Sequence, residues 1–328
     1  MDGTRRAPAR SQATIADLGD GVIRITQPLP WALDHVHCYA LVDPEGWTLV
    51  DAGLGTPGTI RRWEEALERL GSPAIRRIVV THYHPDHLGG AAALAELTGA
   101  PEVVQGALDA ELSQLTWVEL DEAGFLDFLR LHGMPDDLAV ASAAAEARMP
   151  VVPVTPTRLV GEGDVVEVGG VSYEVLVLPG HADGHIVLLD RQRGRVFGGD
   201  VILTGITPNI GRWEDTAPDP LSRYLDSLSR LVEAGPKLVF PGHRDPIERV
   251  AERAQELRVH HAERLEAAHS ALVDGARTAY EVAQRLWATS GFSLHEQRFA
   301  LAEALAHVER LETEARARQV EPGRFEPV

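Results

Sequence analysis

Hydrophobic and polar residues follow two alternating patterns up to about residue 246. Short apolar runs bounded by Gly, Pro and Asp are typical of strands, whereas apolar residues spaced three and four apart are typical of helices. Thr56 followed by Pro57 predicts the start of a helix that ends near Gly71. Strands alternating with helices predict an α/β fold. We expect strands at residues 21–26, 36–42, 47–50, 75–80, 165–168, 171–178, 186–190, 195–197 and 238–240.

The pattern changes after Pro246, where a helix rich in Glu, Arg and Ala is expected to run to about Asp274. Two capping boxes, one beginning at Thr278 and one at Ser293, each predict the start of a further amphipathic helix. The residues around Gly323 predict a short β-hairpin. We therefore divide the chain into an N-terminal arm (1–13), a larger α/β domain (14–246) and a small, mostly helical C-terminal domain (247–328).

Residues 107–150 form a helix-like stretch inside the α/β domain, which Gly124, Gly133 and Pro135 are expected to interrupt. An insertion of this kind can cover a pocket. Its aromatic residues include Trp117, Phe125 and Phe128.

Composition narrows the classes of function. The chain has 328 residues, of which 31 are basic and 49 acidic, giving a formal net charge of −18. This balance disfavours nucleic acid as a partner, because phosphate binding depends on Lys and Arg. Cys38 is the only cysteine, which excludes a disulfide framework, a Cys-rich zinc finger and an iron–sulfur cluster, and we expect it to be a small buried residue. Without a transmembrane run or a signal-peptide core, we expect a cytoplasmic protein with no membrane partner, for which an oligomer is compatible.

The strongest chemical signal is the motif His82-x-His84-x-Asp86-His87, directly after a predicted buried strand. Alternate residues of an extended segment face the same side, so His82 and His84 can bind one metal ion together. The turn at Pro85 then redirects Asp86 and His87 toward a neighbouring position. Clustered histidines without cysteine suit zinc, and also manganese or iron.

Three more candidate ligands each follow a predicted strand. His181 ends a Pro-Gly-His sequence, Asp200 ends Gly-Gly-Asp, and His243 ends a second Pro-Gly-His. Strand ends with small residues allow a rigid sheet to present ligands. Together with the first motif, these residues make seven candidate ligands, which is enough for two metal ions.

The order of these four motifs resembles the metallo-β-lactamase superfamily, particularly its glyoxalase II-like hydrolases, over residues 23–243. The resemblance implies an αββα four-layer sandwich, and the tail after Pro246 resembles the winged-helix domain of one subgroup. By position, it implies that His82, His84 and His181 hold one zinc ion, that Asp86, His87 and His243 hold a second, and that Asp200 bridges them.

The resemblance also implies a mechanism of metal-assisted hydrolysis. Two ions that share a water lower its pKa to roughly 7, so that hydroxide forms at neutral pH. We expect Asp86 or Asp200 to orient this hydroxide for attack on a carbonyl or phosphoryl centre, while one metal ion polarises the substrate oxygen. Manganese or iron can take the place of zinc.

Further polar residues near these motifs have supporting roles in this interpretation. Asp51 resembles a family position beside the metal loop and is expected either to support the ligands or to stabilise a turn. His185 is expected to orient or pack against the ligands rather than bind metal. His35 and His37 imitate a metal pair but lack the following Asp-His, so we interpret them as strand residues or pocket contacts. His261 lies in a charged helix and is expected to be solvated.

A set of mainly aromatic residues is expected to line an apolar mouth suited to an acyl chain. It combines the aromatic residues of the insertion with the segment 206–213. The predicted pocket residues are His35, His37, Trp117, Phe125, Phe128, Asn209 and Trp213.

The choice of substrate follows from the resemblance. A bridging Asp200 favours esters, thioesters, lactones or phosphodiesters over β-lactams. Residues 201–203 lack the tyrosine common in homoserine-lactone hydrolases, and the tail lacks a basic glutathione cluster. The first hypothesis is therefore a hydrolase of a small-molecule ester or thioester. The alternatives are a lactonase, a metal-dependent endoribonuclease or phosphodiesterase, and a non-enzymatic metal-binding scaffold.

Overall fold

The computed structural model describes residues 13–275, 277–287 and 289–328. Most of the predicted N-terminal arm therefore lies outside the described residues. Ala13, the first described residue, is buried in the core beside the first sheet. No helix in these three ranges is long and apolar enough to cross a membrane.

The first sheet contains seven strands within the described residues, and they lie side by side in chain order. Strands β1 to β4 pair antiparallel, and β4 to β7 pair parallel. The strands are β1 (Thr14–Asp17), β2 (Val22–Pro28), β3 (His35–Leu41), β4 (Trp47–Val50), β5 (Ile75–Val80), β6 (Glu102–Gly106) and β7 (Arg158–Val160).

The second sheet contains five strands of the described chain in the order β12-β11-β10-β9-β8. Only its β11–β12 pair is parallel among these pairings. The strands are β8 (Val165–Val168), β9 (Val171–Val177), β10 (Ile186–Asp190), β11 (Arg195–Gly199) and β12 (Leu238–Pro241).

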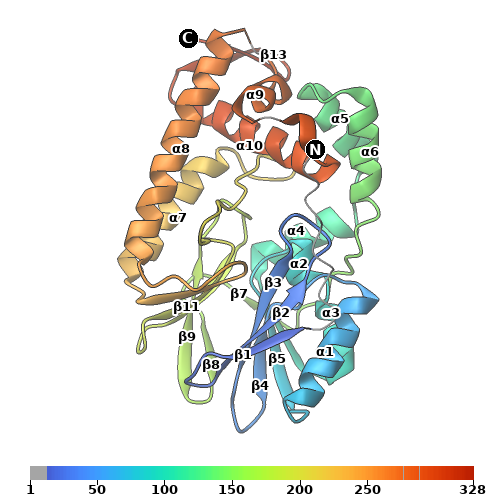
Figure 1. The fold of residues 1–328 in the computed structure, drawn as a ribbon, viewed down its shortest axis with the longest axis vertical. Coiled ribbons are helices and arrows are strands. Elements are labelled where there is room, and N and C mark those ends of the chain that lie inside the picture. The colour runs from blue at the N-terminus through green and yellow to red at the C-terminus, as the bar shows by residue number, and fades with distance from the viewer. Residues whose placement is uncertain (1–12, 276, 288) are drawn as a thin grey trace, which may run out of the picture.

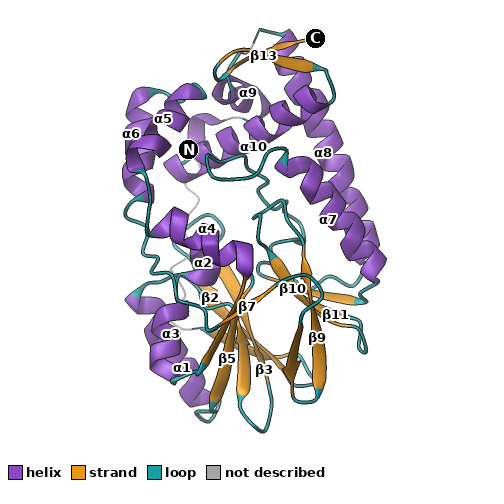
Figure 2. Ribbon diagram, turned by 180° about the vertical axis from the view of Figure 1, so that it is seen from behind, coloured by secondary structure: helices purple, strands orange, loops and turns teal. Residues whose placement is uncertain are grey.

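The two sheets pack face to face, with helices on both outer faces (Figure 2). Tyr39 of the first sheet packs against the rings of Phe197 and Phe240 from the second, which also stack on each other. Trp63 of α1 is buried against the first sheet, and Tyr224 of α7 is buried against the second. The predicted αββα sandwich is therefore confirmed. Its helices are α1 (Pro57–Arg69), α2 (Pro85–Leu88), α3 (Ala91–Thr98), α4 (Ala107–Trp117), α7 (Pro220–Ala234) and α8 (Val250–Val273).

A group of helices with a β-hairpin, which we call the helical cap, lies at one end of the sandwich (Figure 1). Both predicted capping boxes are present, at Thr278 and Ser293. The predicted hairpin around Gly323 is also present. The cap consists of α5 (Glu122–Leu131), α6 (Asp136–Glu146), α9 (Ala279–Leu286), the short 3-10 helix η1 (Thr289–Gly291), α10 (Leu294–Thr313), β13 (Ala317–Glu321) and β14 (Arg324–Pro327).

Two helices of the insertion 107–150, α5 and α6, belong to the helical cap. The sequence pattern did not indicate this. Leu129 of α5 and Ala139 of α6 share one hydrophobic cluster with Leu301 and Leu305 of α10. Gly124 does not interrupt the insertion as predicted, because it lies inside α5, where its N–H donates to the N-cap side chain of Asp121. The helical breaks fall before and after α5 instead.

Gly133 sets how closely the insertion approaches α9, and its replacement tests this packing. It has φ +90°, and a Cβ there would lie 2.3 Å from the Thr278 hydroxyl that caps α9. We expect Gly133→Ala to lower the free energy of unfolding in a urea titration by about 1–2 kcal/mol for the left-handed backbone, plus about 1–3 kcal/mol for the clash. Gly163→Ala is the matched control, because Gly163 has φ +80° with no atom within 4 Å of a Cβ. Equal losses in both variants would contradict this account.

Candidate functional site

Separate segments of chain bring the predicted ligands to the end of the sandwich that faces the helical cap (Figure 1). The first motif follows β5 of the first sheet, and its Asp86 and His87 lie on the one-turn helix α2. His181, Asp200 and His243 follow β9, β11 and β12 of the second sheet. Both sheets therefore supply side chains to one region.

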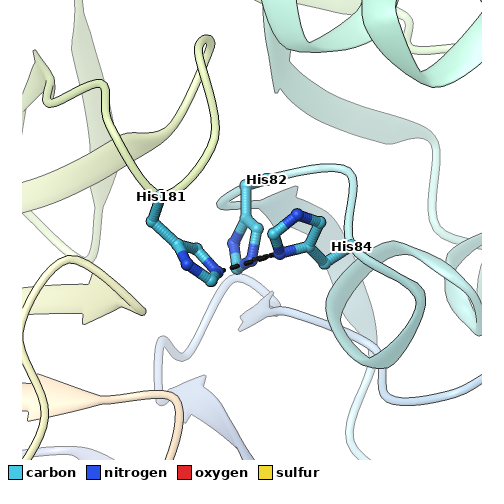
Figure 3. A group of neighbouring side chains, drawn as sticks. All are labelled: His82, His84 and His181. Carbon is cyan, nitrogen blue, oxygen red and sulfur yellow. Dashed lines mark hydrogen bonds between the residues drawn. The ribbon is translucent and has the colours of Figure 1, made fainter. Parts of the chain in front are cut away.

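The first ligand group combines histidines from both sheets (Figure 3). His82 Nε2 lies 3.1 Å from His84 Nδ1, which lies 2.9 Å from His181 Nε2. The ligand nitrogens all lie within 4.8 Å of one another. This is an arrangement in which three imidazoles can hold one metal ion.

The second ligand group lies next to the first and contains Asp86, His87 and His243. His243 Nε2 is 3.3 Å from Asp86 Oδ2 and 3.2 Å from Asp200 Oδ2. The same Asp200 oxygen is 3.6 Å from His181 Nε2 in the first group. Asp200 therefore contacts both groups, which is the position expected of a bridging carboxylate.

In four of the five histidines of the two groups, the ring nitrogen that points away from the other ligands is hydrogen-bonded. His82 Nδ1 lies 3.0 Å from the Thr81 hydroxyl, which accepts this bond because its own hydrogen goes to Asp51. Such bonds fix the tautomer and direct the Nε2 lone pair toward the centre. The other three donate from Nδ1: His87 to Asp51 Oδ2 (2.8 Å), His181 to the Asn209 carbonyl (2.8 Å) and His243 to the His35 carbonyl (2.6 Å).

Burial and charge set the protonation of the imidazoles. Burial lowers the pKa of His82, His84 and His181, so these rings are neutral at pH 7 and can each offer a lone pair. Burial also acts to lower the pKa of His243, but the Asp200 carboxylate overcomes it and raises the pKa to about 10. In the protein without a metal ion, a proton on His243 therefore supplies positive charge to the carboxylates.

Buried polar atoms of the second group and of Asp200 lack a hydrogen-bond partner among the described residues. They are His87 Nε2, His243 Nε2 and Asp200 Oδ1. Leaving a buried polar atom unpartnered costs about 1–3 kcal/mol. His87 Nε2 and Asp200 Oδ1 are 3.5 Å apart, so one cation between them would partner both. The donor set of imidazoles and carboxylates without sulfur therefore fits metal ions in both groups, zinc among them.

Two positions explain how the ligands come so close together. A Cβ at Gly242 would lie 2.5 Å from Asp200 Oδ1 and 2.6 Å from His87 Cε1, so no other residue fits in this Pro-Gly-His segment. Asp51 has φ +62° and accepts hydrogen bonds from the Thr81 N–H and from His87. Asp51 thus holds a ligand directly as well as shaping the loop.

His185 lies beside the ligands and faces the backbone. Its Nε2 accepts a hydrogen bond of 3.1 Å from the Asp200 N–H, and its ring stacks on His82 with centroids 4.6 Å apart. The nitrogen nearest the centre is therefore already occupied. This geometry agrees with an orienting role and leaves no lone pair at Nε2 for a metal ion.

A cavity of about 1910 Å³ lies between the ligand groups and the helical cap. Phe128 is not among its lining residues, and this prediction was wrong. Its ring packs into the cap core, 4.7 Å from the ring of His132, because α5 has to cover that core as well as the cavity. The predicted pocket residues that line the cavity are His35, His37, Trp117, Phe125, Asn209 and Trp213.

The cap supplies much of the cavity wall, which sequence reasoning missed. Trp31 before β3 stacks on His295 of α10, with ring centroids 5.3 Å apart. Phe299 of the same helix lies 5.5 Å from Trp213. No local signal marks these residues, because their proximity to the ligands arises only when the cap folds over the sandwich. The cap residues that line the cavity include Trp287, Phe292, Leu294, His295, Arg298, Phe299 and Glu303.

Sequence reasoning also missed Asp109 on α4. It is fully buried, and its oxygens accept hydrogen bonds from the Tyr83 N–H (2.9 Å) and from Gln105 Nε2 (2.7 Å). Tyr83 stands between two histidines of the first motif, so Asp109 holds the loop that carries them. Burial raises the pKa of Asp109 to about 8.

His261 is buried, and the prediction that it is solvated was wrong. Only 1% of its surface is exposed, and its ring lies 5.4 Å from that of Tyr224 and 5.5 Å from that of His307. The reason is that α8 packs against α7 at one end and against the cap at the other. The spacing of apolar residues along α8 therefore does not show which face of this helix is exposed.

Comparison with known proteins shows similarity over most of the chain. The profile of the family described as "Metallo-beta-lactamase superfamily" matches residues 31–243. The probable metallo-hydrolase YqjP of Bacillus subtilis is 30% identical, over 90% of this chain and 93% of its own length. The acyl-coenzyme A thioesterase MBLAC2 of Gallus gallus is 27% identical, over 69% of this chain and 78% of its own. The structure of metallo-beta-lactamase family protein TTHA1429 from Thermus thermophilus has a TM-score of 0.83 and 31% identity, over 95% of this chain and 100% of that chain.

The raised pKa of Asp109 predicts a specific pH dependence of stability. The folded carboxyl keeps its proton up to a pKa of about 8, whereas the unfolded one loses it near its ordinary pKa of 3.8. The stabilisation that the protonated Asp109 carboxyl adds to the free energy of unfolding is therefore fully present below pH 4, and it is lost as the pH rises to about 8. We expect the free energy of unfolding of the parent, minus that of Asp109→Asn, to decrease over this interval in urea titrations. A difference that stays constant from pH 4 to 8 would show that the carboxyl is ionised throughout.

Proposed function

The chain belongs to the metallo-β-lactamase superfamily of hydrolases, and we propose that it uses two metal ions, zinc by preference, to hydrolyse a thioester or carboxylic ester. The observation that carries this proposal is the pair of adjoining His/Asp groups that opens into a large cavity lined by aromatic side chains.

The proposed ligand sets follow two of the three groups of neighbouring His and Asp side chains. The third group combines one histidine of each set, His82 and His87, with Asp200. His82, His84 and His181 would hold one ion, and Asp200 would contact both. Asp86, His87 and His243 would hold the second. When bound, the two cations would act as Lewis acids toward the substrate and lower the pKa of water between them to roughly 7.

The carboxylates of the chain have the charge that the reaction requires. Burial alone would raise the pKa of Asp86, but His87 and His243 lower it to about 2. The carboxylate is therefore ionised at neutral pH and can accept a hydrogen bond from the attacking water. Asp200 would be a second acceptor for the same water, through the carboxylate oxygen that no cation engages. The two acceptors would orient the water toward the carbonyl carbon.

The cavity supports an acyl substrate. Its aromatic walls are suited to an acyl chain, and a thiolate leaves without help from an acid because thiols have a pKa near 8.5. The similarity to a protein named as an acyl-coenzyme A thioesterase points to the same class of bond. The aromatic lining residues are Trp31, Tyr83, Trp117, Phe125, Trp213, Trp287, Phe292 and Phe299.

We also propose that the chain is a glyoxalase II-like hydrolase, in which domain 14–246 is followed by a winged-helix-like domain 247–328. The succession of α8, α9 and α10 with the hairpin β13–β14 supports the second part, since a winged helix consists of helices followed by a β-hairpin. The shared hydrophobic cluster of the insertion and the C-terminal helices indicates that this domain is a fixed part of the pocket.

A hydrolysis assay with defined metal content tests the proposal. We expect a panel of acyl-coenzyme A and aryl esters to include substrates that the zinc- or manganese-loaded protein hydrolyses, and we expect a chelator to abolish the reaction and added metal to restore it. Asp86→Ala and Asp200→Asn should each lower kcat/KM by roughly 100-fold or more, because each removes an acceptor that orients the water.

Asp164→Asn is the control for these variants, because Asp164 is an exposed residue of a surface turn outside the cavity. We expect it to retain parental activity. Near-normal turnover in Asp86→Ala and Asp200→Asn would refute their assignment, and a metal-loaded protein that leaves the whole ester panel intact would refute the proposed substrate class.

A further inference from the structure

Two arginines, Arg24 and Arg244, line the cavity beside the ligand groups without a carboxylate partner. No carboxylate of the described residues lies within 4.0 Å of either guanidinium group, although the chain carries a net charge of −18. Arg298, which also lines the cavity, pairs with Glu146. The two unpaired cations are thus unlike the cavity arginine that has a structural partner.

The backbone of Arg244 is held on both sides by histidines. Its N–H donates to His35 Nε2 (3.2 Å), and its carbonyl accepts from His37 Nε2 (3.0 Å). Arg244 has φ +67°, a conformation that costs about 1–2 kcal/mol for a residue with a Cβ. The His-x-His pair, whose nitrogens are fully used by these and neighbouring bonds, therefore fixes the residue after the ligand His243 in a strained conformation.

Arg24 approaches the same place from β2. Thr26 pairs with His37 across the β2–β3 register, and Arg24, two residues earlier, is on the same face of the strand. Burial, followed by the charge of Arg24, lowers the pKa of His37 to about 3, so this ring is neutral at pH 7. Asp34 is near enough for Arg244 to help lower its pKa, but it bonds to His35 at 2.6 Å.

The guanidinium groups of Arg24 and Arg244 have hydrogen-bonding capacity that the described residues leave unused. The Nε atoms of Arg24 and Arg244 are both buried, and neither has a hydrogen-bond partner among the described residues. The paired N–H groups of a guanidinium match the oxygens of a carboxylate or phosphate in both geometry and charge. A neutral group lacks the complementary charge. An anion that reaches both guanidinium groups would supply the missing acceptors.

We propose that Arg24 and Arg244 bind an anionic group of the substrate, a phosphate or a carboxylate, beside the ligand His243. The inference rests on the proposed ester or thioester hydrolysis, because it assigns the charged end of that substrate. A phosphate would come from the thiol side of the substrate, as in a coenzyme A thioester, and a carboxylate from the acyl side.

Binding of non-hydrolysable thioethers tests the site without the reaction. The probes for isothermal titration calorimetry with the metal-loaded protein are S-butyl-coenzyme A, which carries phosphates, an N-acetylcysteamine thioether ending in a carboxylate, and neutral S-butyl-N-acetylcysteamine. We expect the parent to bind one of the anionic probes at least tenfold more tightly than the neutral one. Arg24→Gln and Arg244→Gln should each raise Kd for that probe about tenfold and leave the neutral probe unchanged.

Two further variants make the result specific. Arg244→Lys keeps the charge but loses the fork, so its Kd should fall between those of the parent and Arg244→Gln. Arg61→Gln removes the same charge from the exposed face of α1, outside the cavity, and should bind like the parent.

The outcomes separate this inference from the proposed function. Arginine-dependent binding of an anionic probe by a metal-loaded protein that hydrolyses neither thioesters nor carboxylic esters would support the anion site and refute the function. Thioester hydrolysis and anionic-probe binding that are both unchanged in the glutamine variants would support the function and overturn the anion site. Equal weakening of the neutral and anionic probes would also overturn it, because it would indicate a structural effect of the substitutions.

Discussion

The structure depends on the mutual neutralisation of carboxylates and imidazoles that are buried together at one end of the sandwich. Asp86 and Asp200 are only 8% and 6% exposed. Removing an unpaired carboxylate from water costs several kcal/mol, so positive charge has to accompany both. In the protein alone, protons on His87 and His243 supply it, which is why the pKa of each of these histidines is raised. Metal ions would supply the same charge and would free the lone pairs of both rings.

This constraint extends outward from the ligands to the helical cap. His181 donates to the carbonyl of Asn209, whose side-chain amide donates to Glu303 of α10 at 2.9 Å. Glu303 is buried, which raises its pKa to about 7. Trp31 stacks on His295 at the start of the same helix. The cap is therefore connected by hydrogen bonds and ring contacts to the loops that carry the ligands, and the cavity is shaped by both parts.

The sequence allowed most of the elements and the candidate ligands to be predicted, because both are local signals. Strands β1, β6 and β7 of the first sheet were not predicted. Strand ends after Val80 and Gly199 mark where side chains leave the sheets, and the capping boxes at Thr278 and Ser293 mark helix starts. The seven predicted ligands do lie together, while their binding of metal stays a prediction.

The residue environments that the sequence did not predict depend on tertiary packing. Asp109 holds the first motif from a helix that follows β6, and the periodicity of α5 could not tell that Phe128 faces the cap core. Likewise, His261 is covered on two sides by elements that are distant in sequence. Such contacts leave no pattern in the segment that makes them.

The most direct test of the central claim is anomalous X-ray diffraction at the zinc edge from crystals of the protein grown with zinc. We predict two anomalous peaks, one contacted by His82, His84 and His181 and the other by Asp86, His87 and His243, with Asp200 in contact with both. Crystals that bind zinc only at other positions, or that show these seven side chains without any peak between them, would contradict the account.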